Sequence, residues 1–175
     1  VADHGAGGKA RRHLARSDAG GQLVERGGKS AAVAGNIGPT LLDTLAEKID
    51  TNTLPQVWVL ELSSFQLDGV THFEPAAAAV LNVTQDHLDW HGSMAACTQA
   101  KAAVFGSQAL MLLNRDDPAV MALQPGLVTV KVGNRNRQQS ARPWASFGFD
   151  TPSRAGDWGI ESVNGMAWLV RALAL

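Results

Sequence analysis

The chain has 175 residues, 45% of them hydrophobic and 18% charged, a composition typical of globular domains rather than disordered ones. Its net charge of -1 argues against nucleic acid or an anionic membrane as a partner, and the single cysteine, Cys97, excludes an internal disulfide and a multi-cysteine zinc site. The apolar runs are too short for a membrane span and no signal peptide is visible, so we expect a cytoplasmic protein without membrane insertion.

Residues 1–28 are rich in Gly, Arg and Ala and show no apolar periodicity. The run from Gly5 to Lys9 matches the G-x-x-G-K core of a loop that binds phosphates through backbone amides and a lysine. However, no apolar strand precedes it, and Ala10 stands where Ser or Thr would supply a hydroxyl to Mg²⁺. The residues that follow, 11–21, also predict a poor helix, whereas a phosphate-binding loop leads into a helix. The sequence of the run alone therefore favours an ordinary loop.

Short apolar runs and helical patterns alternate in the middle of the chain. The stretch Pro39–Ile49 places its leucines on one face, and Met94–Phe105 has a cap at Ser93 and a stop at Gly106. The alternation predicts an α/β fold, a mostly parallel sheet flanked by helices on both faces. The predicted strands are Lys29–Ala34, Val57–Leu62, Ala76–Val83 and Ala109–Leu113.

The end of the chain has a different pattern. The strands predicted over Trp158–Val163 and Met166–Val170 are joined by Asn164 and Gly165, a pair that supplies the positive φ angles of a type I′ turn. We therefore predict a β-rich antiparallel tail attached to the edge of the parallel sheet.

Polar residues stand at the carboxyl end of each predicted strand. Ligands of open parallel sheets bind at the carboxyl ends of the strands, so these side chains are expected along one rim. Such a set of oxygen and nitrogen donors suits a hard divalent cation and a phosphorylated ligand. The residues are Asn36; Glu61, Ser63, Ser64 and Gln66; Asp86 and His87; and Asn114 and Asp116.

Each candidate also has a structural interpretation. Glu61 is either a metal ligand, which we favour, or half of an ion pair, whereas His87 and Asn36 taken alone are better explained as turn residues. Lys101 either extends to solvent or points into the site. We interpret Cys97 as structural and the remaining histidines, His4, His13, His72 and His91, as surface residues.

Taken together, the motifs resemble the central ATPase domain of the Mur ligase family, from about Gln22 to about Asp117 and more weakly to the tail. The Ser-Ser-Phe-Gln after Glu61 resembles the branch that joins D-glutamate to UDP-N-acetylmuramoyl-L-alanine. The matching runs are Gly35–Gly38, Glu61–Leu67, Asn82–Asp89, Ala100–Lys101 and Asn114–Asp117.

The resemblance implies amide ligation in peptidoglycan synthesis by a monomeric enzyme. ATP would phosphorylate the substrate carboxylate to an acyl phosphate, the D-glutamate amine would attack it, and two Mg²⁺ ions would neutralise the transferred group. Glu61, His87 and a carbamylated Lys101 would be the catalytic metal ligands. Asn36, Ser63 and Gln66 would contact the UDP-muramoyl substrate, and Gly5, Gly8 and Lys9 would be the remains of the ATP loop.

The first residues depart from the family pattern, whose loop reads G-T-N-G-K-[ST] after a strand. Codons for a family-like Val-Thr-Ser-Leu, translated with the reading frame shifted by one base, can give the Arg-His-Leu-Ala of Arg12–Ala15. We therefore predict that residues 1–28 are a degraded or out-of-frame ATP-loop region. Residues 29–175 are then a partial central domain, and the family's N-terminal UDP-binding and C-terminal domains are expected to be absent. We expect no turnover from such a piece alone.

Two other functions remain open. One is a related ligase with the same mechanism and another amino acid, such as a folylpolyglutamate synthase relative, although Ser-Ser-Phe-Gln argues against it. The other is a non-catalytic nucleotide-binding fragment, which titration with Mg-ATP would separate from a competent site.

Overall fold

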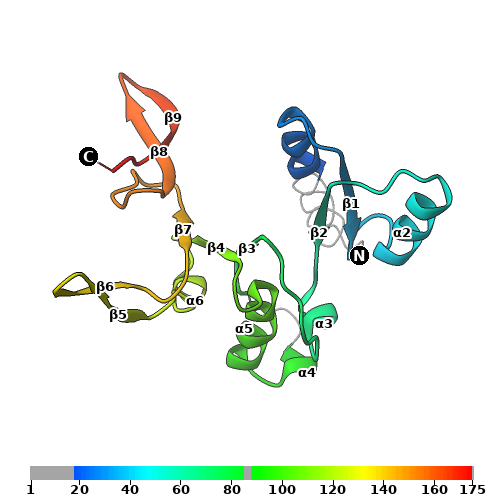
Figure 1. Cartoon of the computed structure of the whole chain (residues 1–175), viewed down its shortest axis with the longest axis horizontal. Coiled ribbons are helices and arrows are strands. Elements are labelled where there is room, and N and C mark those ends of the chain that lie inside the picture. Colours follow the sequence, from blue (N-terminus) through cyan, green and yellow to red (C-terminus); the bar gives the residue numbers. More distant parts are fainter. Residues whose placement is uncertain (1–17, 85–87, 175) are drawn as a thin grey trace, which may run out of the picture. The chain divides into compact units, whose positions relative to one another are not determined.

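The computed structural model describes residues 18–84 and 88–174 (Figure 1). The chain divides into two compact units, a first unit over Val1–Gln66 and a second unit over Leu67–Leu175. Among the described residues, no helix is both long and apolar enough to cross a membrane.

The first unit contains a pair of parallel strands, β1 (Ala31–Gly35) and β2 (Val57–Glu61). Between them, α2 (Leu41–Asp50) begins after Thr40, whose hydroxyl accepts a hydrogen bond from the amide of Asp43. This side-chain cap satisfies one of the amides that a helix start leaves without a partner. Both predicted strands and the predicted helix of this unit are confirmed.

A further helix precedes β1, over residues 18–26, and the prediction of a poor helix there was wrong. Gly20 and Gly21 lie against the strands: a Cβ on Gly21 would be 2.7 Å from Val33 Cγ2, and one on Gly20 would be 3.1 Å from Val59 Cγ1. The glycines lower helix propensity but allow the helix to approach the strands closely. Tertiary packing therefore outweighs local propensity at this point.

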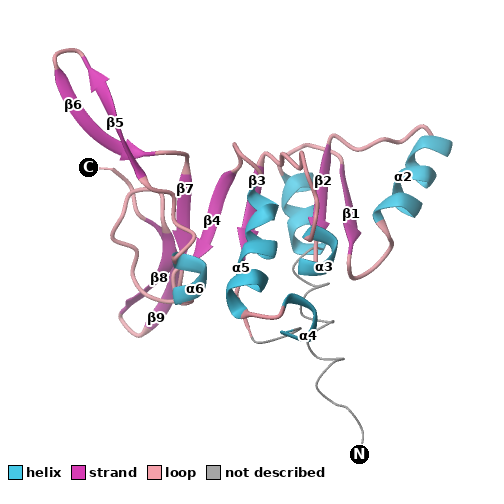
Figure 2. Cartoon of the chain, turned by 90° about the horizontal axis from the view of Figure 1, so that it is seen from below, coloured by secondary structure: helices cyan, strands magenta, loops and turns pink. Residues whose placement is uncertain are grey.

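The second unit is built on a five-stranded sheet in the order β3-β4-β7-β8-β9 (Figure 2). Neighbouring strands are parallel from β3 to β8, and β9 is antiparallel to β8. A mostly parallel sheet with an antiparallel tail at its edge is therefore confirmed. The strands are β3 (Ala77–Val80), β4 (Leu110–Asn114), β7 (Trp144–Phe147), β8 (Trp158–Val163) and β9 (Met166–Arg171).

The core of the second unit lies where short helices cover β3 and β4. Helix α5 (Met94–Ala102) begins at the predicted cap Ser93, continues as the 3-10 helix η1 (Ala103–Phe105) and ends at Gly106, which has a φ of 49°. Cys97 on α5 is buried, with only 1% of its surface exposed, which agrees with its structural interpretation. The core side chains are Val80, Val83, Phe105, Met111, Leu113 and Val120, the last from α6 (Pro118–Met121).

Two hairpins complete the second unit. Asn164 and Gly165 have φ angles of 52° and 78°, so the predicted type I′ turn between β8 and β9 is confirmed. The hairpin of β5 (Leu127–Val132) and β6 (Arg135–Ser140) was not predicted. Its Gly133 has a φ of 61°, which suits the first central position of a two-residue hairpin turn.

Candidate active site

In the first unit, the carboxyl ends of β1 and β2 bring Asn36 beside Glu61. The backbone amide of Asn36 donates a hydrogen bond to the backbone carbonyl oxygen of Glu61 over 2.7 Å. Gly35 makes this approach possible, because a Cβ there would collide with the same carbonyl oxygen and its φ of 146° favours glycine. The structure therefore joins two of the residues that the sequence placed on the rim.

The carboxylate of Glu61 is partly buried, and its Oε2 atom is shielded from solvent. A carboxylate withdrawn from water is stabilised by hydrogen-bond donors or by a cation. Oxygen donors of this kind, at the carboxyl end of a parallel strand, fit a hard divalent ion. The surroundings of Glu61 are thus compatible with the metal-ligand role that we favoured.

Ser63 and Gln66 bind each other at the start of α3 (Ser64–Leu67). The backbone amide and the hydroxyl of Ser63 donate to the side-chain oxygen Oε1 of Gln66 over 3.0 and 3.1 Å. In return, Ser63 Oγ accepts a hydrogen bond from the backbone amide of Gln66 over 3.3 Å. This reciprocal arrangement is a capping box, and its S-x-x-Q signature was readable in the sequence. Any ligand of Ser63 or Gln66 therefore meets a preformed pair.

In the second unit, side chains hold the segment that follows β3. The Lys101 amine contacts this segment through a backbone carbonyl. The hydrogen bonds are Lys101 Nζ to the carbonyl of Asn82 (3.0 Å), Asn114 Nδ2 to the carbonyl of Leu81 (2.7 Å), and the amide of Val83 to Asp117 Oδ2 (2.8 Å).

Asn114 and Asp116, which the sequence places on the rim, bind backbone groups of neighbouring loops. Asn114 Oδ1 accepts from the amide of Asp116 over 3.0 Å, and Asp116 Oδ2 accepts from the amide of Phe149 over 3.0 Å. Both side chains therefore help to hold the loops that follow the parallel strands.

The other predicted site residues divide between the units or lie outside the described residues. Glu61, Asn36, Ser63 and Gln66 belong to the first unit, and Lys101 belongs to the second. Residues 18–84 and 88–174 contain no group of three or more His, Cys, Asp or Glu side chains that could hold a metal ion. The predicted residues outside the description are Gly5, Gly8, Lys9, Asp86 and His87, with the surface histidines His4 and His13.

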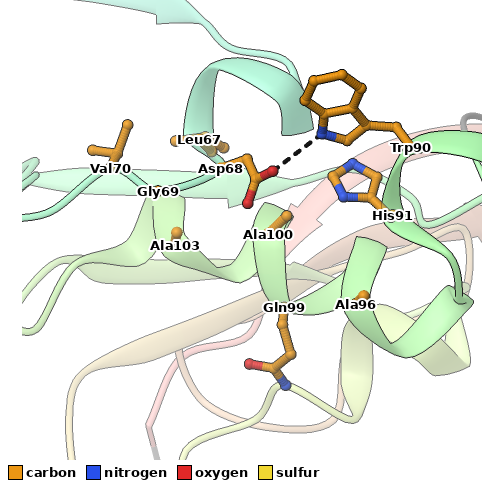
Figure 3. A pocket seen from close by; sticks show the side chains of 10 residues that line it. All are labelled: Leu67, Asp68, Gly69, Val70, Trp90, His91, Ala96, Gln99, Ala100 and Ala103. Atoms are coloured by element: carbon orange, nitrogen blue, oxygen red, sulfur yellow. Dashed lines mark hydrogen bonds between the residues drawn. The ribbon is translucent and has the colours of Figure 1, made fainter.

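A cavity of about 430 Å³ in the second unit was not foreseen (Figure 3). Asp68 accepts a hydrogen bond from the Trp90 indole over 3.1 Å at its rim, and α4 (Leu88–His91) supplies one wall. His91, predicted to be a surface residue, is partly buried and lines the cavity, whereas His72 is exposed as predicted. The lining residues are Leu67, Asp68, Gly69, Val70, Trp90, His91, Ala96, Gln99, Ala100 and Ala103.

The chain is similar to several known proteins that share one name. The chain is 65% identical over 153 residues to a UDP-N-acetylmuramoylalanine--D-glutamate ligase of Albidiferax ferrireducens, covering 87% of this chain and 29% of the relative. The protein of that name from Polaromonas is 64% identical over 152 residues, covering 87% and 25%, and that from Burkholderia cenocepacia is 50% identical over 153 residues, covering 87% and 29%. The chain thus spans less than a third of the length of these relatives.

The family profile described as the Mur ligase middle domain matches residues 23–149. That match covers well over half of the chain and includes both strands of the first unit, together with β3, β4 and β7 of the second. The chain therefore belongs to the Mur ligase middle domain family.

Proposed function

We propose that this chain is the central part of an ATP-dependent ligase that joins D-glutamate to UDP-N-acetylmuramoyl-L-alanine. The observation that carries the proposal is the hydrogen bond from Lys101 to Asn82, because it joins two separate sequence motifs at the carboxyl end of a parallel strand. The relatives named as D-glutamate ligases support the same substrates.

In this proposal, Glu61, His87 and Lys101 would be the residues that bind Mg²⁺, and the ion would supply charge neutralisation for the transferred phosphoryl group. An ammonium group cannot bind a cation, so Lys101 acts as its carbamate. Its neutral amine adds to the carbon of CO₂, a C–N bond forms and one proton leaves. The nitrogen keeps one N–H, which can still donate to the Asn82 carbonyl, and the new carboxylate would supply the oxygen donors that a hard cation prefers.

The other proposed roles concern binding. Asn36, Ser63 and Gln66 contact the UDP-muramoyl substrate, and the contacts between Ser63 and Gln66 hold these two side chains ready before it arrives. Such preorganisation lowers the entropy lost on binding. Gly5, Gly8 and Lys9 would bind the ATP phosphates, with their backbone amides and the lysine ammonium as the donors.

A chimera tests the function. Residues 23–149 replace the corresponding segment of the Albidiferax ligase, and phosphate release is measured with ATP, UDP-N-acetylmuramoyl-L-alanine and D-glutamate. We expect release at about 1 per second or more that requires both co-substrates. The Glu61→Gln and Lys101→Arg chimeras should lose at least about a hundredfold, the usual loss when one stabilising contact to a transition state is removed.

Other outcomes of the same assay contradict the proposal. Turnover with L-glutamate and a folate in place of the two co-substrates would assign the chain to a folylpolyglutamate-type ligase. A folded chimera without turnover, together with binding of Mg-ATP by the chain itself, would indicate a non-catalytic nucleotide-binding module. The chain by itself is expected to give no turnover, so its own rate near 1 per second would contradict our prediction for residues 1–28.

A further inference from the structure

In the second unit, residues 105–109, from the last residue of η1 to the start of β4, are held by two charged side chains from distant parts of the chain. Glu74 lies just before β3. Its carboxylate accepts hydrogen bonds from the backbone amide of Ser107 over 2.9 and 3.0 Å and from the backbone amide of Gln108 over 3.3 Å. Arg142 lies just before β7 and binds the opposite, carbonyl side of the same loop. We call these two side chains the loop clamp.

The Arg142 guanidinium binds carbonyl oxygens that the end of a helix leaves without partners. It donates to the carbonyls of Phe105 (2.8 Å), Gly106 (2.9 Å) and Ala109 (2.9 Å). A planar fork of donors can bind several acceptors at once, which a lysine ammonium on a flexible stem cannot reproduce.

The backbone of the loop is fitted to this clamp. Gly106 has a φ of 49°, and a Cβ at this position would collide with the carbonyl oxygen of Phe73 and lie 2.8 Å from the Glu74 carboxylate. The amides of Ser107 and Gln108, with the charge of Arg142, lower the pKa of Glu74 from its ordinary value. The carboxylate is thus ionised at neutral pH and is a strong acceptor for the loop amides.

The clamp lies at the end of the helix that carries Lys101. Lys101 is in the last turn of α5, and η1 continues from that turn without a break to Phe105, whose carbonyl Arg142 binds. Ser93 caps the other end of α5. The loop clamp therefore fixes the end of α5 nearest to the contact between Lys101 Nζ and the Asn82 carbonyl.

We propose that Glu74 and Arg142 are positioning residues: by clamping residues 105–109, they hold the last turn of α5 so that the Lys101 amine stays on the Asn82 carbonyl. The catalytic importance of this placement rests on the proposed function. The placement itself can be tested without substrates, metal or ATP.

The test is competitive acetylation of the folded chain by limiting acetic anhydride at pH 8, with mass spectrometry reading each lysine separately. The variants are Arg142→Gln, Arg142→Lys and Glu74→Gln; the matched controls, Arg137→Gln and Glu161→Gln, change exposed residues of β6 and β8. Lys131 on β5 is exposed and serves as the internal reference. Hydrogen exchange at Ser107 and Gln108 reports on the clamp itself.

We expect the acetylation of Lys101 relative to Lys131 to rise about three- to tenfold in Arg142→Gln and Glu74→Gln, the factor that corresponds to one hydrogen bond of ordinary strength. Arg142→Lys should restore little of the protection, and the controls should match the parent chain. If Arg142→Gln does not fold, Glu74→Gln, which keeps the guanidinium in place, decides the question.

The opposite result is also clear. Faster exchange at Ser107 and Gln108 with unchanged acetylation of Lys101 would show that the clamp only stabilises its own loop, and the inference would be overturned. An inactive chimera combined with more reactive Lys101 in the clamp variants would contradict the proposed ligase function and leave the positioning role supported.

Discussion

The parallel strands and the hairpins of the second unit are stabilised in different ways. Leu113 on β4 is completely buried, whereas Leu127 on β5 and Leu169 on β9 are 69% and 71% exposed. Central parallel strands are covered on both faces, so their free energy of folding comes mainly from apolar burial. The hairpins depend more on backbone hydrogen bonds and on turns that need positive φ angles. Substitutions in the parallel strands should therefore change stability through the side-chain volume they remove, and substitutions in the hairpins through the geometry of the turns.

Leu113→Ala should have the largest effect. The substitution opens a cavity in a packed core and should lower the free energy of unfolding by about 2–5 kcal/mol. Leu169→Ala removes the same atoms from an exposed position and should change it by less than about 0.5 kcal/mol. Urea unfolding followed by circular dichroism measures both, and similar losses in the two variants would remove the distinction between the regions.

Asp157→Asn should come next, because it breaks a buried link between β7 and β8. Asp157 is 4% exposed, accepts from the amide of Ser146 over 2.7 Å and pairs with Arg154 over 2.6 Å. Loss of a charged acceptor here should cost about 2 kcal/mol. Asp89→Asn, on an exposed residue of α4, is the control in the same urea experiment, and a stable Asp157→Asn variant would show that β8 is held by other contacts.

Gly165→Ala should have a smaller effect, confined to the hairpin of β8 and β9. The φ of 78° at this position costs an alanine about 1 kcal/mol. Hydrogen exchange should accelerate across β8 and β9 and stay unchanged at Leu113. Ser162→Ala, at an exposed position of β8, should change neither region. Acceleration in β4 as well would show that the hairpin and the core unfold together.

The smallest effect expected is on pH dependence. Hydrogen bonds from the amides of the loop lower the pKa of Glu74 below 4.5, its ordinary value, so the folded state binds the proton less tightly than the unfolded state. The resulting stabilisation is present above that value and is lost as the pH falls through the lower folded pKa. Between about pH 5 and pH 3, stability should therefore fall less steeply in Glu74→Gln than in Glu161→Gln. Equal slopes would contradict the role of the Glu74 charge.

Much of the fold follows from local sequence patterns. The continuous apolar runs identified β1 to β4, Ser93 and Gly106 marked the limits of α5 with η1, and the Asn164–Gly165 pair gave the last turn. The helix over residues 18–26 escaped prediction because its glycines are justified only by the strands against which they pack. The strand β6 escaped because Arg-Asn-Arg-Gln-Gln-Ser carries no apolar alternation; only the Gly133 turn signalled it.

The candidate site was predictable only in part. The rule that ligands bind at the carboxyl ends of parallel strands was enough to pair Asn36 with Glu61. It did not show that Asn114 and Asp116 would bind backbone groups, since a polar residue after a strand can face a ligand or a loop. Glu74 and Arg142 could not be inferred, because their partners are 33 to 37 residues away along the chain.

The turn of the hairpin formed by β5 and β6 is a suitable site for inserting a tag. Its two strands pair only with each other among the described residues, and Lys131, Val132 and Arg135 beside its turn are exposed. Exposed loop tips of this kind are among the sites of a domain that best tolerate inserted sequence. A short epitope or a fluorophore-binding tag placed between Gly133 and Asn134 would allow the protein to be immobilised or tracked without touching the parallel strands.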